Sequence, residues 1–262
     1  MGYAASGSWL YILGGQDLNK GLYNSLWRIN LQTVRDHVHN ASWEHVNYRG
    51  DIPRAISHGC MFVYENKLFV YDINGTEEVH KKEKRSKKQA ENQEDSKMSK
   101  SQPVLFYVLN LQTFVWTCWR GDDVPQVDDF AYCVDQDHGD LYLFGGYLNG
   151  TKSNVMIQIQ INRKFTSILS PDTPANHPNA RNLPSQRTGA RMAFMPKTGD
   201  IYMFGGLTAN NQTLNDMWCF STRQERWTLV HQRGDVPEPR CGHTISCHHE
   251  KLFLFGGLKE VT

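Results

Sequence analysis

Short apolar runs that end in paired glycines recur along the chain. Each run joins large aliphatic and aromatic residues over four positions, a length and composition that predict a strand buried on both faces. Paired glycines predict a strand end where the backbone needs positive φ or a close approach. The glycines are Gly14, Gly15, Gly145, Gly146, Gly205, Gly206, Gly256 and Gly257, in the runs 10–15, 141–146, 201–206 and 252–257; a fifth run, 68–73, lacks the pair.

A second signal lies between the runs. The triplet Arg-Gly-Asp begins at residues 49, 120 and 233, with a proline soon after, and it predicts a turn. An aromatic residue precedes each arginine by six positions, namely Trp43, Phe114 and Trp227, and is predicted to belong to the strand before the turn. The regular position of the triplets favours a structural role over integrin binding.

The remaining segments complete a repeating unit of four strands. Residues 30–33 and 110–113 share the sequence Asn-Leu-Gln-Thr and predict matching turns, with 221–224 as a weaker copy. Strands are then expected after each proline turn, at each glycine pair, and at segments such as 25–30 and 42–46. Four short strands in about 50 residues predict a propeller blade. No segment predicts a helix.

This pattern resembles the kelch repeat. The resemblance is carried by the glycine pairs, by Trp43 and Trp227, and by residues 237–244, which look like the kelch segment before the innermost strand. Residues 53–59 and 186–191 are looser versions. The resemblance implies an all-β, kelch-type β-propeller over residues 1–262. We expect about four complete four-stranded blades (1–50, 51–121, 122–184 and 185–237) and half of a further blade (238–262), so the chain reads as a fragment or needs other segments to close the ring.

The second blade departs from the pattern through a polar insertion at residues 72–102. Residues 80–100 hold eight basic and four acidic side chains and little apolar area, which predicts disorder. The basic run 81–88 is interpreted as a solvated loop; a nuclear import signal or a contact to an acidic partner is the alternative. Aromatic residues that could stack on bases are missing from this run, which disfavours nucleic-acid binding.

Charge and composition narrow the function classes. The chain has 28 Lys+Arg and 27 Asp+Glu, so its net charge of +1 gives no general attraction to nucleic acid or anionic membranes. Apolar runs stay well below the roughly 20 residues that span a bilayer. The first residues do not read as a secretion signal, and the six cysteines form no Cys-x-x-Cys pair, so we expect free thiols and a cytoplasmic protein. An extracellular adhesion or carbohydrate-binding propeller is an alternative that would need a leader and glycans at Asn40, Asn74, Asn149 and Asn211.

Catalytic or metal-binding chemistry finds little support in the sequence. Cys and His suit zinc, and Cys241, His243, Cys247 and His249 are the best candidates. These residues fall in the repeat segment, on the innermost strand and at the expected hairpin turn 248–250, so structural roles are favoured. Phosphate-binding loops and nucleophile motifs are missing. We predict no catalytic residue, metal or cofactor; a kelch-type enzyme or small-ligand binder at the channel mouth is the alternative.

Loops on a rigid propeller are where recognition is expected. Four arginines lie near the starts of the innermost strands: Arg54, Arg187, Arg191 and Arg240. Together they could hold an acidic peptide by bidentate contacts, although each could pair instead with an acid such as Asp51 or Asp235. The sequence therefore predicts a non-catalytic protein-interaction module, an adaptor or scaffold, that binds a protein or peptide and neither nucleic acid nor membrane.

Overall fold

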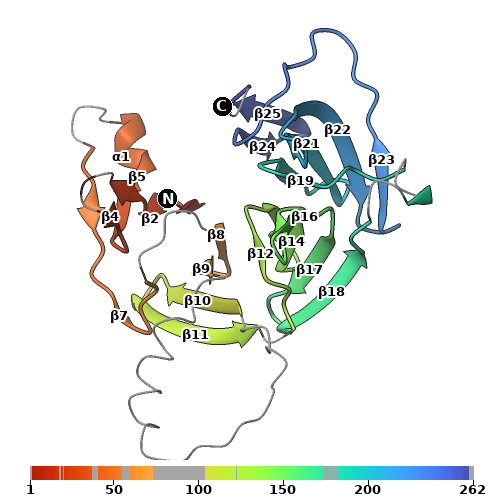
Figure 1. Ribbon diagram of the computed structural model, residues 1–262. Helices are drawn as coiled ribbons and strands as arrows, with labels where there is room; N and C mark the ends of the chain where they lie inside the picture. The colour runs from red at the N-terminus through yellow and green to blue at the C-terminus, as the bar shows by residue number, and fades with distance from the viewer. Residues whose placement is uncertain are drawn as a thin grey trace, which may run out of the picture. The chain divides into compact units, whose positions relative to one another are not determined.

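The computed structural model describes residues 2–17, 19, 21–36, 41–54, 60–72, 104–121, 123–173, 177–178 and 182–259. The chain divides into two compact units, Met1–Val124 and Pro125–Thr262, which are described separately (Figure 1).

Unit 1 begins with a four-stranded antiparallel sheet in the order β1-β2-β5-β6. Its strands are β1 (Gly2–Ser6), β2 (Trp9–Leu13), β5 (Leu26–Asn30) and β6 (Glu44–His45). The loop between β2 and β5 carries a small hairpin of β3 (Gln16–Asp17) and β4 (Gly21–Leu22).

The second sheet of unit 1 has the order β7-β11-β10-β9-β8, in which β7 adds a parallel strand to an antiparallel set of four. The strands are β7 (Arg49–Gly50), β8 (Cys60–Tyr64), β9 (Lys67–Asp72), β10 (Val104–Asn110) and β11 (Val115–Gly121). The predicted insertion at 72–102 lies outside the described residues except for residue 72, so its disorder stays a prediction.

Unit 2 begins with the antiparallel sheet β13-β14-β17-β18, beside a small sheet β12-β15-β16. The large sheet contains β13 (Ala131–Asp135), β14 (Asp140–Phe144), β17 (Met156–Gln160) and β18 (Phe165–Ser170). The small sheet contains β12 (Val127–Asp128), β15 (Tyr147–Leu148) and β16 (Thr151–Lys152).

The next sheet of unit 2 repeats this arrangement, with β19 and β20 both pairing with β21, followed by β22 and β23. A two-stranded sheet β24-β25 comes last. The strands are β19 (Arg187–Thr188), β20 (Arg191–Met195), β21 (Asp200–Thr208), β22 (Thr213–Ser221), β23 (Arg226–Leu229), β24 (Thr244–His248) and β25 (Lys251–Phe255).

Within each unit, neighbouring sheets pack through their first strands and share a core. In unit 1, β1 contacts β8, and the core includes Leu13, Met61 and Trp116. In unit 2, β20 contacts both β13 and β24, and the core includes Phe144 and Trp227. Sheets of four antiparallel strands that pack in this way are the blades of a propeller. The predicted all-β fold of propeller-type blades is confirmed.

The glycine pairs have the predicted backbone conformation. All eight glycines have φ between 64° and 113°. A Cβ atom on Gly145 would lie 2.6 Å from the carbonyl oxygen of Arg187, and one on Gly205 would lie 2.5 Å from that of Arg240. Larger residues would therefore clash as well as strain the backbone. One detail differs from the prediction, because β21 continues through its glycine pair with an irregularity between Phe204 and Gly206.

The expectation of an all-strand chain is wrong at one place, the short helix α1 (Leu31–Asp36). The Asn30 Oδ1 atom accepts hydrogen bonds from the backbone N–H groups of Gln32 and Thr33, at 2.9 and 3.3 Å. Asn110 makes the same two contacts in the matching segment. This cap can begin either a turn or a helix. In the second copy Phe114 takes a φ of 52°, and the chain then enters β11 directly.

The aromatic residue six positions before each Arg-Gly-Asp triplet was predicted to lie in a strand. This prediction is correct for Trp227 and wrong for Phe114 and Trp43. Trp227 lies in β23, is 4% exposed and pairs with Phe220. Its structural equivalent in unit 1 is Trp116, which is 1% exposed and pairs with Leu109. Phe114 lies in the preceding turn. Trp43 precedes β6 and is 46% exposed, so it is not a core residue of its sheet.

The prediction from this spacing fails because the three Arg-Gly-Asp triplets occupy different positions relative to the strands. Arg49 and Gly50 form β7, whereas Arg120 and Gly121 end β11. Only the triplet at 233–235 lies outside strands, with a bend at Gly234 and Asp235. A shared turn is therefore not the reason for the repeated triplet.

Candidate binding surface

Unit 2 contains three segments that lead into its first strands, and we call them the lead-in segments: residues 125–130, 184–190 and 237–243. Their backbone contacts repeat. The Arg187 N–H donates to the Ser153 carbonyl oxygen at 3.0 Å, and the Arg187 carbonyl accepts from Gly146 at 2.9 Å. Arg240 repeats both contacts with Leu214 and Gly206, at 3.0 and 2.9 Å. Each arginine thus ties its lead-in segment to the sheet before it.

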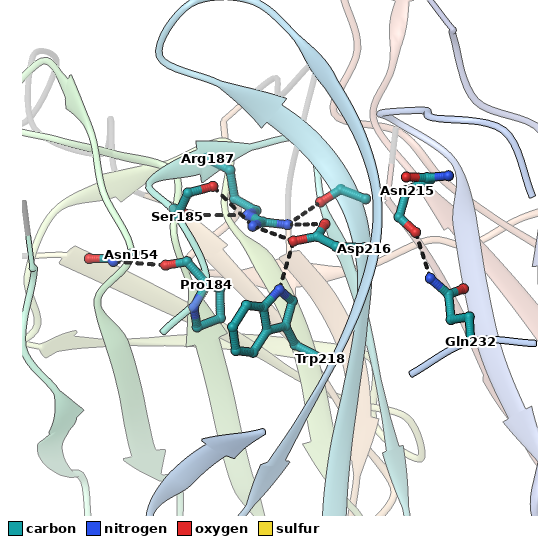
Figure 2. A network of polar contacts seen from close by, with 9 residues as sticks. Asn154, Pro184, Ser185, Arg187, Asn215, Asp216, Trp218 and Gln232 are labelled. Atoms are coloured by element: carbon teal, nitrogen blue, oxygen red, sulfur yellow. Dashed lines mark hydrogen bonds and ion pairs between the residues drawn. The ribbon is translucent and has the colours of Figure 1, made fainter. Parts of the chain in front are cut away.

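Arg187 also ties this segment to its own sheet, from an interior position that is 1% exposed. Its guanidinium donates from Nη1 to Asp216 Oδ1 at 2.6 Å and from Nη2 to Asp216 Oδ2 at 2.8 Å (Figure 2). Further contacts go to the carbonyl oxygens of Gly205 and Ser185 and to the Ser185 hydroxyl, each at 3.0 Å. The Trp218 indole donates to Asp216 Oδ2 at 2.6 Å. All three guanidinium nitrogens are engaged within the chain, which disfavours Arg187 as a peptide contact; its role in binding stays a prediction.

Arg240 makes the same short-range contacts without a carboxylate. Its Nε donates to the Glu238 carbonyl oxygen at 3.0 Å, and its Nη1 donates to that of Gly256 at 3.0 Å. These match the contacts of Arg187 with Ser185 and Gly205. In the described part of the chain Arg240 forms no ion pair, and its side chain is half-buried.

Arg191 begins β20 and differs from both of these arginines. It is half-buried, and its Nη1 donates only to the neighbouring Ala190 carbonyl oxygen at 2.8 Å. The described residues include no carboxylate within ion-pair distance of it. A guanidinium with most of its donors unused can take a carboxylate in a bidentate contact. Of the predicted arginines in unit 2, Arg191 is therefore the one with the most donors available for a partner.

His243 lies beside this arginine but is a packing residue. It is 1% exposed, and its ring contacts Phe204 edge-on at 5.6 Å between centroids. Neither ring nitrogen has a hydrogen-bond partner among the described residues. Burial, followed by the charges of Arg191 and Arg240, lowers the pKa of His243 from 6.5 to about 4, so the imidazole is neutral at pH 7.

The nearby thiol, Cys241, is held in its protonated form. Cys241 is buried, and burial followed by the charge of Asp129 raises its pKa above the ordinary value of 9.0, although Arg191 and Lys152 act in the opposite direction. A protonated thiol is a poor nucleophile and metal ligand.

In the parts of the chain that the structure describes, no group of three or more His, Cys, Asp and Glu side chains is arranged so that it could hold a metal ion. Cys247 lies in β24, and the predicted hairpin turn is confirmed at His249 and Glu250, which have φ of 47° and 57°. All six cysteines are free thiols, as expected.

Lys152 is a residue that the sequence reasoning missed and that holds a loop of unit 2 in place. It lies in β16, and its ammonium donates to the Thr208 carbonyl oxygen at 2.6 Å and to Asn211 Oδ1 at 3.1 Å. Burial lowers its pKa below 10.5. These contacts join β16 to the end of β21 and to the loop that follows it, so Lys152 holds this loop in place. Nothing in its local sequence distinguishes it from a surface lysine.

The second lead-in segment is held by another polar network. The Asn154 side-chain amide donates to the carbonyl oxygen of Pro184 at 2.8 Å (Figure 2). It also donates to that of Thr173 at 3.2 Å. Its Oδ1 accepts from the Thr173 N–H at 2.7 Å. Asp172 accepts from the Ser153 hydroxyl and from the Asn154 N–H. The two described ends of the proline-rich linker 171–184 are thus fixed on the same loop.

Arg54, the remaining predicted arginine, belongs to unit 1. It is half-buried between β7 and β8 and is already engaged in an interaction. Residues 55–59, which follow it, lie outside the described residues.

Comparison with known proteins agrees with this architecture. Residues 173–262 match the family described as "KLHDC2/KLHL20/DRC7 Kelch-repeats domain". Kelch domain-containing protein 2 from Bos taurus is 22% identical over 254 residues, covering 95% of this chain and 58% of the relative. Kelch domain-containing protein 3 from Bos taurus is 25% identical over 127 residues, covering 46% of this chain and 32% of the relative. The tRNA wybutosine-synthesizing protein 2/3/4 of Oryza sativa subsp. japonica is 34% identical over 77 residues, covering 29% of this chain and 7% of the relative.

The C-terminal third of the chain therefore matches a kelch-repeat family, and relatives named for kelch domains support the same assignment. The matches of the chain cover less than two thirds of each of these relatives. Kelch repeats typically serve as protein-interaction modules. Across the described ranges, no helix has the length and apolar character that crossing a membrane requires.

Proposed function

We propose that the chain is a non-catalytic protein-interaction module, an adaptor or scaffold of the cytoplasm, and that Arg191 is the central contact for an acidic segment of its partner. The observation that carries this proposal is the half-buried guanidinium of Arg191. It has one local hydrogen bond and no carboxylate partner among the described residues. Partial burial strengthens a charge-assisted contact, because less water competes for the donors.

The neighbouring residues favour binding over catalysis. Cys241 and His243 are a candidate nucleophile and base that feel the charge of Arg191. Burial keeps the thiol protonated, and a pKa of about 4 makes the imidazole a weak base at pH 7. The lead-in segments are in turn fixed to the sheets by Arg187 and Asn154, which gives Arg191 a rigid setting.

A displayed library of random peptides tests the proposal. We expect the wild-type chain to enrich sequences with clustered Asp and Glu, and we expect Arg191→Glu to lose this enrichment. Arg223→Glu makes the same charge change in the exposed turn between β22 and β23 and should enrich the same peptides as wild type. Equal enrichment by wild type and Arg191→Glu would show that Arg191 is not the contact.

A further inference from the structure

Arg191 and His243 belong to segments of unit 2 that are tied together. The Gly242 N–H donates to the Gly189 carbonyl oxygen at 2.8 Å, which joins the third lead-in segment to the second. A Cβ atom on Gly189 would lie 3.1 Å from the Cβ atom of Cys241, so the two segments are in close contact there. The strands that follow them, β20 and β24, also contact each other. The arginine and the histidine therefore lie in one closely packed part of unit 2.

Phe204 links the two side chains more directly. It pairs with Arg191 across β20 and β21, and the side chains of paired residues lie on the same face of a sheet. The His243 ring contacts the Phe204 ring edge-on. A Cβ atom on Gly205 would lie 3.3 Å from His243 Cε1, and one on Gly257 would lie 2.8 Å from His243 Cβ, so the histidine fills a space that glycines leave open. The imidazole is thus held in place on the face that Arg191 shares.

The interior position of His243 makes its protonation depend on nearby charge. The residue is 1% exposed, and neither ring nitrogen has a hydrogen-bond partner among the described residues, so a proton on the ring gains no hydrogen bond there. The groups of β21 and of the segment after β25 that pack against it are uncharged. Burial, and then the positive charges of Arg191 and Arg240, lower the pKa of His243. Both arginines therefore oppose protonation.

A carboxylate bound at Arg191 changes this balance. It neutralises one of the two opposing positive charges and adds a negative charge near the ring, where partial burial strengthens the interaction between charges. We propose that binding of an acidic segment at Arg191 is coupled to protonation of His243, so that the chain holds such a partner more tightly as the pH falls from 7 to 5. This inference rests on the proposed function, which supplies the acidic segment at Arg191.

The coupling acts in both directions. A partner that favours the protonated form of His243 is itself bound more tightly when that form is populated. The imidazole of the free chain is neutral at pH 7. An Asp side chain of the partner, with its ordinary pKa of about 3.9, stays mostly ionised down to pH 5. In this range the chain therefore takes up a proton on binding while the partner keeps its charge.

A capped peptide of alternating Asp and Gly residues is the probe, and NMR of the chain with labelled histidines follows the His243 imidazole, assigned through its contact with the Phe204 ring. We expect the peptide to raise the pKa of His243 and to bind about twofold more tightly at pH 5 than at pH 7. His243→Gln should bind the peptide without this gain. His231→Gln removes an exposed histidine and should retain the gain. The NMR titration uses the wild-type chain, so it remains decisive if His243→Gln misfolds.

Removing the arginine charge tests the same coupling without a ligand. Arg191→Gln should raise the pKa of His243, because one of the two opposing charges is lost. The same variant should abolish the response of His243 to the peptide. Arg223→Gln removes an exposed positive charge from the turn between β22 and β23 and should leave the pKa of His243 unchanged.

The outcomes separate this inference from the proposed function. Peptide binding that leaves the pKa of His243 unchanged, or lowers it, would overturn the coupling alone. An unchanged pKa of His243 in Arg191→Gln would do the same, as would an equal change in affinity between pH 7 and pH 5 for wild type and His243→Gln. Failure of the peptide to bind the wild-type chain at either pH would contradict the proposed function, and the coupling with it.

Discussion

The sheets β13-β14-β17-β18 and β20-β21-β22-β23 have the same strand order and a similar position relative to their lead-in segments, but they fill one interior position differently. In the first sheet this position holds two buried valines, Val127 in the lead-in segment and Val155 just before the third strand. In the second sheet the equivalent residues are Arg187 and Asp216, which form a bidentate ion pair, and the Trp218 indole donates a hydrogen bond to the same carboxylate. The comparison shows that an arginine near the start of a first strand can be part of the interior. Exposure and existing partners decide which arginine is available to bind.

The largest effect is expected from removing the carboxylate of this pair. Asp216→Ala leaves the guanidinium of Arg187 buried without a counter-charge, so the free energy of unfolding should fall by about 3–5 kcal/mol. Urea denaturation measures it. Asp235→Ala, at an exposed bend, should change it by less than about 0.5 kcal/mol. A small effect of Asp216→Ala would mean that Arg187 reaches water or another partner.

A similar loss is expected at the core aromatic of the second sheet. Trp227→Ala should lower the free energy of unfolding by about 3–5 kcal/mol, because it leaves a cavity between Phe144 and Phe220. Trp43→Ala removes an exposed side chain, and we expect it to lower the same quantity by less than about 1 kcal/mol. Thermal unfolding of both variants measures the difference. Equal losses would contradict the revised aromatic assignment.

The lead-in segments also differ at Ala190 and His243, and this difference should make stability depend on pH. The pKa of His243 is about 4 in the folded chain and about 6.5 when unfolded, so between these values the unfolded chain binds a proton that the folded chain does not. Stability should therefore fall as the pH decreases from 6.5 to 4, by on the order of 3 kcal/mol from this residue. The variant His243→Ala, which copies Ala190, should show a shallower pH profile in urea denaturation. An unchanged slope would mean that His243 is protonated in the folded chain.

The smallest effect is expected at the apolar version of the pair. Val155→Ala removes two buried methyl groups, so the free energy of unfolding should fall by about 1.5 kcal/mol. Chemical denaturation beside Asp216→Ala gives the contrast between the two sheets. If Val155→Ala costs as much as Asp216→Ala, the charged pair has no special role in stability.

The sequence predicted the blades because their signals are local. The glycine pairs require positive φ wherever they occur, and the apolar runs between turns are short and regular. Helix α1 escaped prediction because Asn30 and Asn110 make the same cap, and only the next residues separate helix from turn. Trp116 was missed because the spacing was counted from Arg120, which lies inside a strand.

The site was harder to predict because it depends on contacts between distant segments. Arg187 and Arg191 look alike in sequence, yet only the third strand shows that Arg187 has a partner. One local signal could have found Asp216, because Ser25 and Asp216 each precede a tryptophan by two residues and follow the first glycine by eleven. The Trp27 indole indeed donates to the Ser25 hydroxyl at 3.2 Å. Lys152 gives no such signal.

The most direct test of Arg191 as the binding arginine is quantitative affinity capture from the source cell. Wild type, Arg191→Glu and Arg223→Glu are compared after confirming equal unfolding midpoints. The account predicts a stoichiometric protein partner on wild type and Arg223→Glu, and at least tenfold less of it on Arg191→Glu, as expected for the loss of a charge-assisted contact and the addition of a like charge. Capture of the same partner in the same amount by Arg191→Glu would contradict it.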